Sequence, residues 1–159
     1  MATREQVLDY LLDEEPTYRI AAEALGVEAL EVLAELVVAA DPLLASKATR
    51  LASEIGSPRA WEVIERAAAR ERDPTVRVAA ASALRRLAAR DPGHEMAFAD
   101  EPNGLLDRLL ADEDAGVRKF ALKAAWELDL RDRLERVASD VTEVGFLRES
   151  AAEMLSRGR

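Results

Sequence analysis

The chain has 159 residues, 49% of them hydrophobic but only 4% aromatic, which excludes a disordered chain and requires a core of alanine, leucine, valine and isoleucine. It contains no cysteine, so disulfides, thiolate metal ligands and a cysteine nucleophile are excluded. The net charge is −9, and residues 1–43 carry ten acidic but only two basic side chains, so this end would repel a phosphate backbone and nucleic acid is disfavoured as a partner.

The first residues do not have the pattern of a signal peptide, because no basic stretch precedes an apolar run. No apolar run approaches the roughly 18 residues that a membrane span needs. We therefore expect a soluble, cytoplasmic protein without a membrane partner.

The first expected element is a helix over about residues 4–14. Thr3 and Gln6 have the spacing of a capping box, in which each side chain satisfies a backbone N–H of the other residue. The segment is strongly acidic, which suits a solubilising cap over residues 1–14 at one end of a stack of helices.

Four later segments begin alike, at Glu15, Asp41, Asp73 and Asp114, and the first three continue with proline. An aspartate accepts hydrogen bonds from the free N–H groups of the first turn, and proline gives up an N–H that has no partner there. Apolar residues then recur with helical spacing, so each start predicts an amphipathic helix. A fifth, weaker copy begins at Val144.

Each of these helices is followed by a second expected helix, at about 28–38, from 58 onward, at 105–110 and at 130–138. Gly26 and Gly56 stand where a left-handed C-terminal cap is needed. The chain is therefore expected to be one domain, 1–159, with repeats at 15–40, 41–72, 73–113, 114–140 and 141–159.

The repeat pattern resembles the HEAT family, especially its bacterial subgroup with short repeats, over about residues 15–155. The residues that carry the likeness are Asp73, Pro74, Val76 and Arg77 with the alanines after them, and less fully Val117 and Arg118. The resemblance implies an all-α fold, a right-handed α-α superhelix of about five helical hairpins. It also implies that Arg77 and Arg118 pair with an aspartate of the neighbouring repeat in a structural role, and the obvious partners are Asp41, Asp73 and Asp114.

Motifs for catalysis are missing from the sequence: there is no phosphate-binding loop, dinucleotide fingerprint or nucleophile elbow. The single histidine, His94, lies in an insertion over residues 89–104 and is expected to be a solvated loop residue. We therefore expect no enzyme, no cofactor and no metal. Met96 and Phe98 are apolar residues in this insertion, expected to pack against adjacent helices, although a loop of this length is often functional or disordered.

The expected function is that of a non-catalytic protein–protein interaction or scaffold module. In a solenoid the second helices would line the concave face and bind a partner protein or peptide there. Because acid is concentrated in the first repeats, the partner is expected to be basic and its binding sensitive to salt. Trp61 is expected to pack between repeats, with a partly open position as the alternative. The residues that we expect to contact the partner are Glu31, Glu35, Trp61, Glu62, Glu65 and Arg108.

Two alternatives are enzymes with HEAT-like repeats. A DNA glycosylase-like protein needs a basic concave groove with aromatic residues and a carboxylate, whereas the expected second helices carry glutamates. A bilin lyase-like protein would act on a chromophore, but no residue pattern in the sequence indicates a chromophore pocket. A homodimer is also expected to be possible through the last helix, whose apolar residues are Phe146, Leu147, Ala151, Met154 and Leu155.

Overall fold

All regular structure in the described residues is helical. The computed structural model describes residues 1–90 and 104–158. The helices are α1 (Arg4–Leu11), α2 (Tyr18–Leu25), a 3-10 helix (Gly26–Ala29), α3 (Leu30–Ala39), α4 (Pro42–Ile55), α5 (Ala60–Ala67), α6 (Pro74–Arg90), α8 (Leu105–Leu110), α9 (Ala115–Glu127), α10 (Arg131–Ser139) and α11 (Gly145–Arg157). The expected all-α class is confirmed. None of the described helices is both long and apolar enough to cross a membrane.

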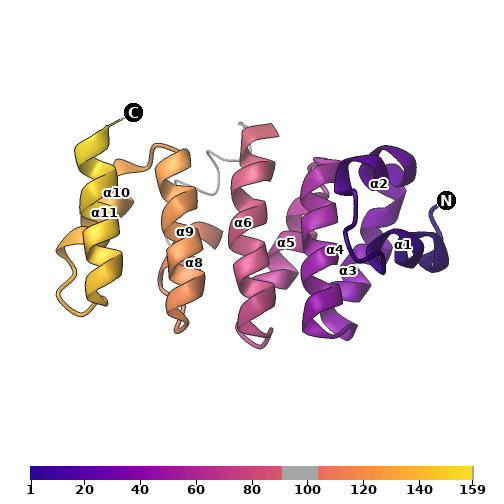
Figure 1. Cartoon of the computed structure of the whole chain (residues 1–159), viewed down its shortest axis with the longest axis horizontal. Coiled ribbons are helices and arrows are strands. Elements are labelled where there is room, and N and C mark those ends of the chain that lie inside the picture. Colours follow the sequence, from indigo (N-terminus) through magenta and orange to yellow (C-terminus); the bar gives the residue numbers. More distant parts are fainter. Residues whose placement is uncertain (91–103, 159) are drawn as a thin grey trace.

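The helices form two layers (Figure 1). We call α4, α6, α9 and α11 the front row, and the shorter helices α3, α5, α8 and α10 behind them the back row. Within the front row each helix contacts the next, and consecutive helices along the chain contact one another between the two rows. The chain therefore passes back and forth between the rows, with α1 and α2 packed at one end.

Helix starts follow the expected capping chemistry. The Asp41 carboxylate accepts hydrogen bonds from the Leu43 and Leu44 amides at 3.0 and 3.1 Å. Asp73 accepts from Thr75, and Asp114 accepts from the Val117 amide at 3.0 Å. The capping box of Thr3 and Gln6 is present as expected, with both reciprocal bonds formed.

The helix ends differ more from the positions and conformations that the sequence predicts. Helix α1 ends at Leu11 rather than near residue 14, and the segment from Gly26 to Ala29 is a 3-10 helix before α3 begins. Gly56 is a left-handed cap as expected, with φ 68° and ψ 19°. The same expectation is wrong for Gly26, whose positive φ of 62° is combined with an extended ψ of −165° because the chain continues directly into the 3-10 turn.

The two rows are packed with side chains of different size. The buried residues of the front row are mostly alanines, whereas the back row buries Leu33, Leu36, Trp61, Ile64 and Leu109. Helix axes approach more closely where the side chains between them are small. The front row should therefore have the smaller spacing and lie on the inner side of any curve.

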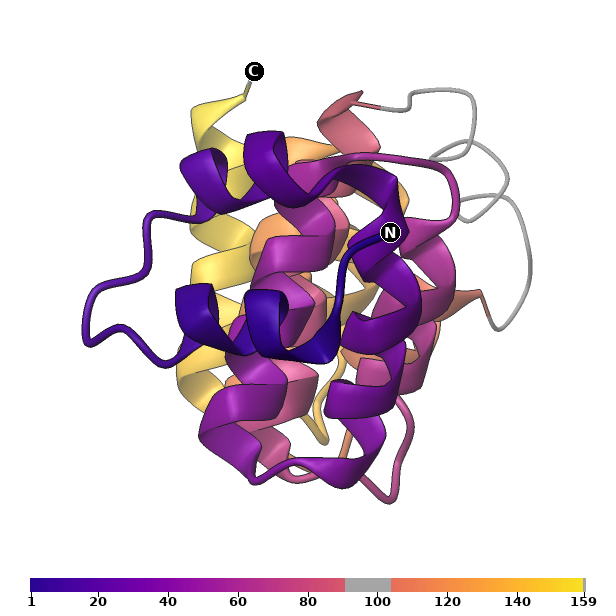
Figure 2. The ribbon, with the colours of Figure 1, turned by 90° about the vertical axis from the view of Figure 1, so that its right-hand side faces the viewer.

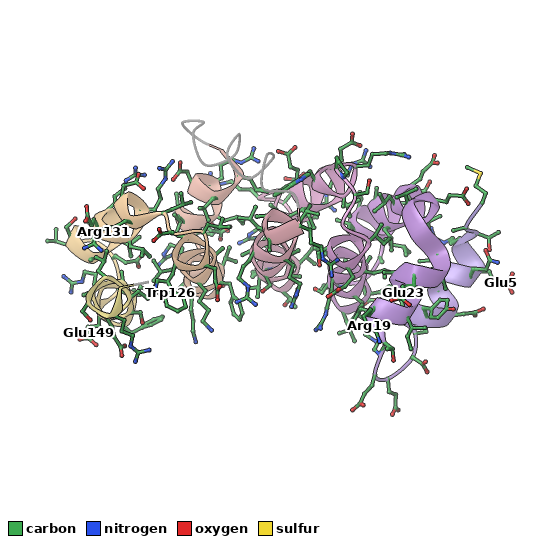
Figure 3. The ribbon with its side chains drawn as sticks, turned by 90° about the horizontal axis from the view of Figure 1, so that it is seen from above. Glu5, Arg19, Glu23, Trp126, Arg131 and Glu149 are labelled. Carbon is green, nitrogen blue, oxygen red and sulfur yellow. The ribbon has the colours of Figure 1, made fainter. Side chains whose placement is uncertain are left out.

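The views from the end and from above agree with this argument (Figures 2 and 3). In both, α11 at one end and α2 at the other extend further toward the front side than α6 does, so the stack curves gently with the front row on its concave side. The expectation that the helices following each Asp-capped helix line the concave face is therefore wrong for this chain, because it took no account of the alanine content of the Asp-capped helices.

The insertion can be followed only at its edges. Helix α6 continues to Arg90, and Gly104 precedes α8. The expectations for His94, Met96 and Phe98 concern residues that lie outside the described part of the chain.

Candidate interaction surfaces

The six residues expected to contact a partner all belong to the back row. Glu31 and Glu35 are on α3, Glu62 and Glu65 on α5, and Arg108 on α8. Two adjoining grooves bring them together. A groove of about 360 Å³ between α3 and α5 is lined by Glu31, Glu35 and Glu62, and one of about 850 Å³ between α5 and α8 is lined by Glu62, Glu65 and Arg108. Because Glu62 and Arg66 line both, the grooves form one surface, which we call the back surface.

Trp61 does not belong to the back surface. Its side chain is 3% exposed and lies in the core between the rows. The expected packing between repeats is confirmed, and the alternative of an open ring that anchors a partner is wrong, because Trp61 falls on the same apolar stripe of α5 as Ile64 and Ala60.

The back surface carries charges of both signs. Arg59 and Arg66 line the first groove beside the three glutamates. Arg4 lies 3.6 Å from Glu35, and Arg108 lies 3.8 Å from Glu65, with all four side chains about half exposed. Pairs this exposed contribute about 0.2–1 kcal/mol each, so they would give way easily to a charged partner. The back surface therefore presents both signs of charge to a partner.

Arg77 and Arg118 each link their own helical hairpin to the loop that precedes the next front-row helix. Arg77 on α6 is 2% exposed, and its Nε and Nη2 donate to the two carboxylate oxygens of Asp112 at 2.8 and 2.9 Å. Arg118 on α9 makes the same two-pronged contact with Glu143 at 2.8 and 2.9 Å. Both arginines also donate to backbone carbonyls of the loop that precedes their own helix. The arrangement fixes loops and helices, which is a structural role.

The pairs shift the pKa of their acids. Burial opposes the ionisation of Asp112, but hydrogen bonds from Arg77 and from the Asp114 amide outweigh it, so the pKa of this carboxyl lies below its ordinary value. For Glu143, the hydrogen bonds from Arg118 are the largest cause, and they lower its pKa despite partial burial. Both acids are therefore held as carboxylates.

The expected identity of these acids is wrong. Asp41, Asp73 and Asp114 are engaged in capping their own helices. The partners come from the loop just before the next front-row helix, two residues before Asp114 in one case and directly before Val144 in the other. An acidic residue in this loop position was the available signal.

A second charged surface lies on the front row, and sequence reasoning missed it. It is formed by outward-facing positions of α2, α4, α6 and α9, and we call it the front patch: Tyr18, Arg50, Arg85, Arg86, Lys119 and Lys123. Figure 3 shows nitrogen-tipped side chains projecting from this side of the row, on the same side as the labelled Trp126 of α9. The signal was present as basic residues at the non-alanine positions of the alanine-rich helices.

Cations and aromatic rings are in direct contact on the front patch. The Arg50 guanidinium lies 4.5 Å from the centroid of the Tyr18 ring, and the Lys123 ammonium lies 5.1 Å from that of Phe120. Burial lowers the pKa of Arg86, and the like charge of Arg50 lowers it further. Burial raises the pKa of Tyr18.

Two carboxylates partly balance this patch. Glu54, whose side chain is 15% exposed, lies 2.9 Å from Arg90 and 4.0 Å from Arg86. Glu127 lies 3.7 Å from Arg85. Arg90 also donates to the carbonyl oxygens of Ser53 and Glu54 at the C-terminal end of α4, where a positive charge is favourable.

In residues 1–90 and 104–158, no group of three or more His, Cys, Asp or Glu side chains is placed to hold a metal ion. No family model matches the chain, and no curated protein matches it either.

Proposed function

We propose that this chain is a non-catalytic protein-interaction module of the HEAT-repeat type, a right-handed α-α superhelix of helical hairpins that holds a partner protein on an exposed face. The repeated geometry supports the family. Asp-capped helices recur along the front row, and each of two successive hairpins sends an arginine to an acid of the next loop, with Arg77 buried and Arg118 partly buried.

The observation that carries the functional part is the continuous back surface over α3, α5 and α8. It is open and it spans several hairpins. Its residues Glu35 and Glu65 are held by weak, half-exposed pairs, whereas Asp107 and Asp112, which also line it, belong to largely buried pairs. An interface needs complementary charges that can exchange their partners without leaving a buried charge unpaired. The half-exposed pairs meet that requirement, whereas Arg77 and Arg118 do not.

The partner proposed for the first groove is a basic segment of another protein. Glu31, Glu35 and Glu62 are all exposed on it, and residues 1–43 add further negative charge at this end. Binding should weaken with salt, because exposed charges are screened beyond about 8 Å at physiological ionic strength.

The test compares two double charge reversals of equal size. Glu31→Lys/Glu35→Lys changes the groove, and Glu5→Lys/Glu149→Lys makes the same change on α1 and α11, where the labelled side chains lie at opposite ends of the stack (Figure 3). Fluorescence anisotropy with a labelled lysine-rich peptide should show clearly weaker binding for the groove variant than for the control. Partners captured from the native cell and identified by mass spectrometry should be lost in the same order. Equal binding by both variants would contradict the proposal.

One requirement of the DNA glycosylase-like alternative is met, because the basic front patch lies on the concave side. Its second requirement is a carboxylate that can reach a substrate. Glu54 is largely buried and paired with Arg90 at 2.9 Å, so its oxygens are already committed. A glycosylase assay on alkylated duplex DNA would decide for this alternative if base release occurs and is abolished by Glu54→Gln.

A further inference from the structure

Within residues 1–90 and 104–158, the front patch has more basic side chains than carboxylates that pair with them. Its basic side chains come from three neighbouring helices, Arg50 on α4, Arg85 and Arg86 on α6, and Lys119 and Lys123 on α9. Among the described residues, no carboxylate lies within ion-pairing distance of Arg50, Lys119 or Lys123. Glu54 is paired with Arg86 and Arg90, and Glu127 is paired with Arg85.

The local sequence explains why the charges converge. Each front-row helix buries the alanines and leucines on either side of these positions, such as Ala48 and Leu51 around Arg50, and Leu84 and Leu87 around Arg86. The side chains therefore have one direction left, away from the core and toward the concave side. The lowered pKa of Arg86 reflects its burial and then the repulsion by Arg50, Arg85 and Arg90, which added negative charge would relieve.

The chemistry of the patch favours carboxylates over nucleic acid. Single-stranded nucleic acid is held by open aromatic rings on which bases stack. Here Arg50 lies over Tyr18 and Lys123 lies over Phe120, so these rings are already in contact with cations. Guanidinium groups, in contrast, pair with carboxylates through two parallel hydrogen bonds.

We propose that the front patch is a docking surface for an acidic segment of a partner protein, which crosses α4, α6 and α9 on the concave side. Packed helices lie about 8–10 Å apart, so the path from α4 to α9 is roughly 16–20 Å. An extended chain covers this distance with about five or six residues. The surface is separate from the back surface, and either can fail its test without the other.

The experiment measures anisotropy of a fluorescein-labelled peptide of about eight residues, mostly glutamate and aspartate. A lysine-rich peptide and a single-stranded oligonucleotide of similar length serve as comparison probes. Arg50→Gln/Lys123→Gln removes two charges from the front patch, and both residues lie on the surface of their helices. Arg131→Gln/Arg136→Gln removes the same charge from α10 in the back row, where both side chains are exposed and line neither groove of the back surface. Circular dichroism checks that both variants are folded.

The acidic peptide should bind the unaltered chain and lose affinity by about three- to tenfold in Arg50→Gln/Lys123→Gln, as expected for two exposed charge contacts. The control should bind almost unchanged, and raising sodium chloride from about 50 to about 500 mM should weaken binding strongly. Equal loss in the two variants overturns the proposal. So does tighter binding of the oligonucleotide than of the acidic peptide, which would identify the patch as a nucleic-acid surface.

Discussion

Replacing Asp112 by asparagine should destabilise the protein strongly, because it leaves a buried guanidinium without its counter-charge. The Arg77 side chain is 3% exposed and the Asp112 side chain 5%. Breaking a buried pair by removing one charge typically costs about 3–5 kcal/mol. Glu113 lies 3.8 Å from Arg77 but is 85% exposed, so it compensates only in part. We therefore expect a loss of about 3 kcal/mol in the free energy of unfolding, and a Tm lower by roughly 6–12 °C for a chain of this size.

Urea unfolding followed by far-UV circular dichroism measures this loss directly. Glu65→Gln is the matched control, since its pair with Arg108 at 3.8 Å is about half exposed and should contribute less than about 1 kcal/mol. The double variant Arg77→Met/Asp112→Leu should recover much of the loss, because no charge is then buried alone. A loss of less than about 1 kcal/mol in Asp112→Asn would refute the reasoning, since the pair would then not be desolvated as the structure has it.

Three further predictions concern pH, a glycine and a tryptophan. The pKa values of Asp112 and Glu143 are lowered in the folded protein, so the unfolded chain binds more protons below about pH 5. The free energy of unfolding should therefore fall as the pH drops below about 5, and it should fall less steeply in Asp112→Asn. Urea titrations at several pH values measure this. Gly56→Ala should cost about 1–2 kcal/mol in thermal unfolding, because φ is +68° and the new Cβ would lie 3.0 Å from Arg90 Cδ. Gly145→Ala, which meets open space, should change stability by less than about 0.5 kcal/mol. In a Trp126→Phe background, acrylamide should quench the fluorescence of buried Trp61 only weakly, and strong quenching would contradict its place in the core.

Local chemistry was predictable from the sequence, as the helix starts show. Asp41 followed by Pro42 contains all the information that the cap needs, because the accepting carboxylate and the donating amides lie within three residues of each other. The same is true of Thr3 with Gln6 and of the left-handed Gly56. The core position of Trp61 followed from its helical spacing with Ile64.

Non-local features were harder to predict. The repeat pattern indicated that Arg77 and Arg118 would meet an acid, but the choice of acid depends on how the loop between two hairpins is folded. The concave side depends on the relative spacing of two rows of helices, which no single repeat reveals. The choice of acid could have been narrowed from the sequence, because an aspartate that caps its own helix is no longer available to a distant arginine.

Part of the candidate site was predictable, because it depends on the local spacing of residues along each helix. Glu31, Glu35, Glu62, Glu65 and Arg108 do converge, because residues three and four apart share a helix face and the back-row helices are neighbours. The front patch was not predicted, because the net charge of residues 44–159 does not show where the basic side chains lie on the surface. All 20 basic side chains of residues 44–159 are balanced by 21 acidic ones, so the count alone shows no basic surface.

The charge asymmetry therefore has to be read by surface rather than along the chain. The acidic excess of residues 1–43 lies on α1, α2, α3 and their loops, at one end of the stack. Lys119 and Lys123 on α9 are separated from that end by α4 and α6, which at about 8–10 Å per helix is more than one screening length at physiological salt. A partner approaching the front patch at α9 thus meets the local positive charge rather than the total of −9. The back-row glutamates lie in the other layer of helices, across the packed core from these cations. One chain can in this way present surfaces of opposite preference, and its net charge predicts the partner of neither.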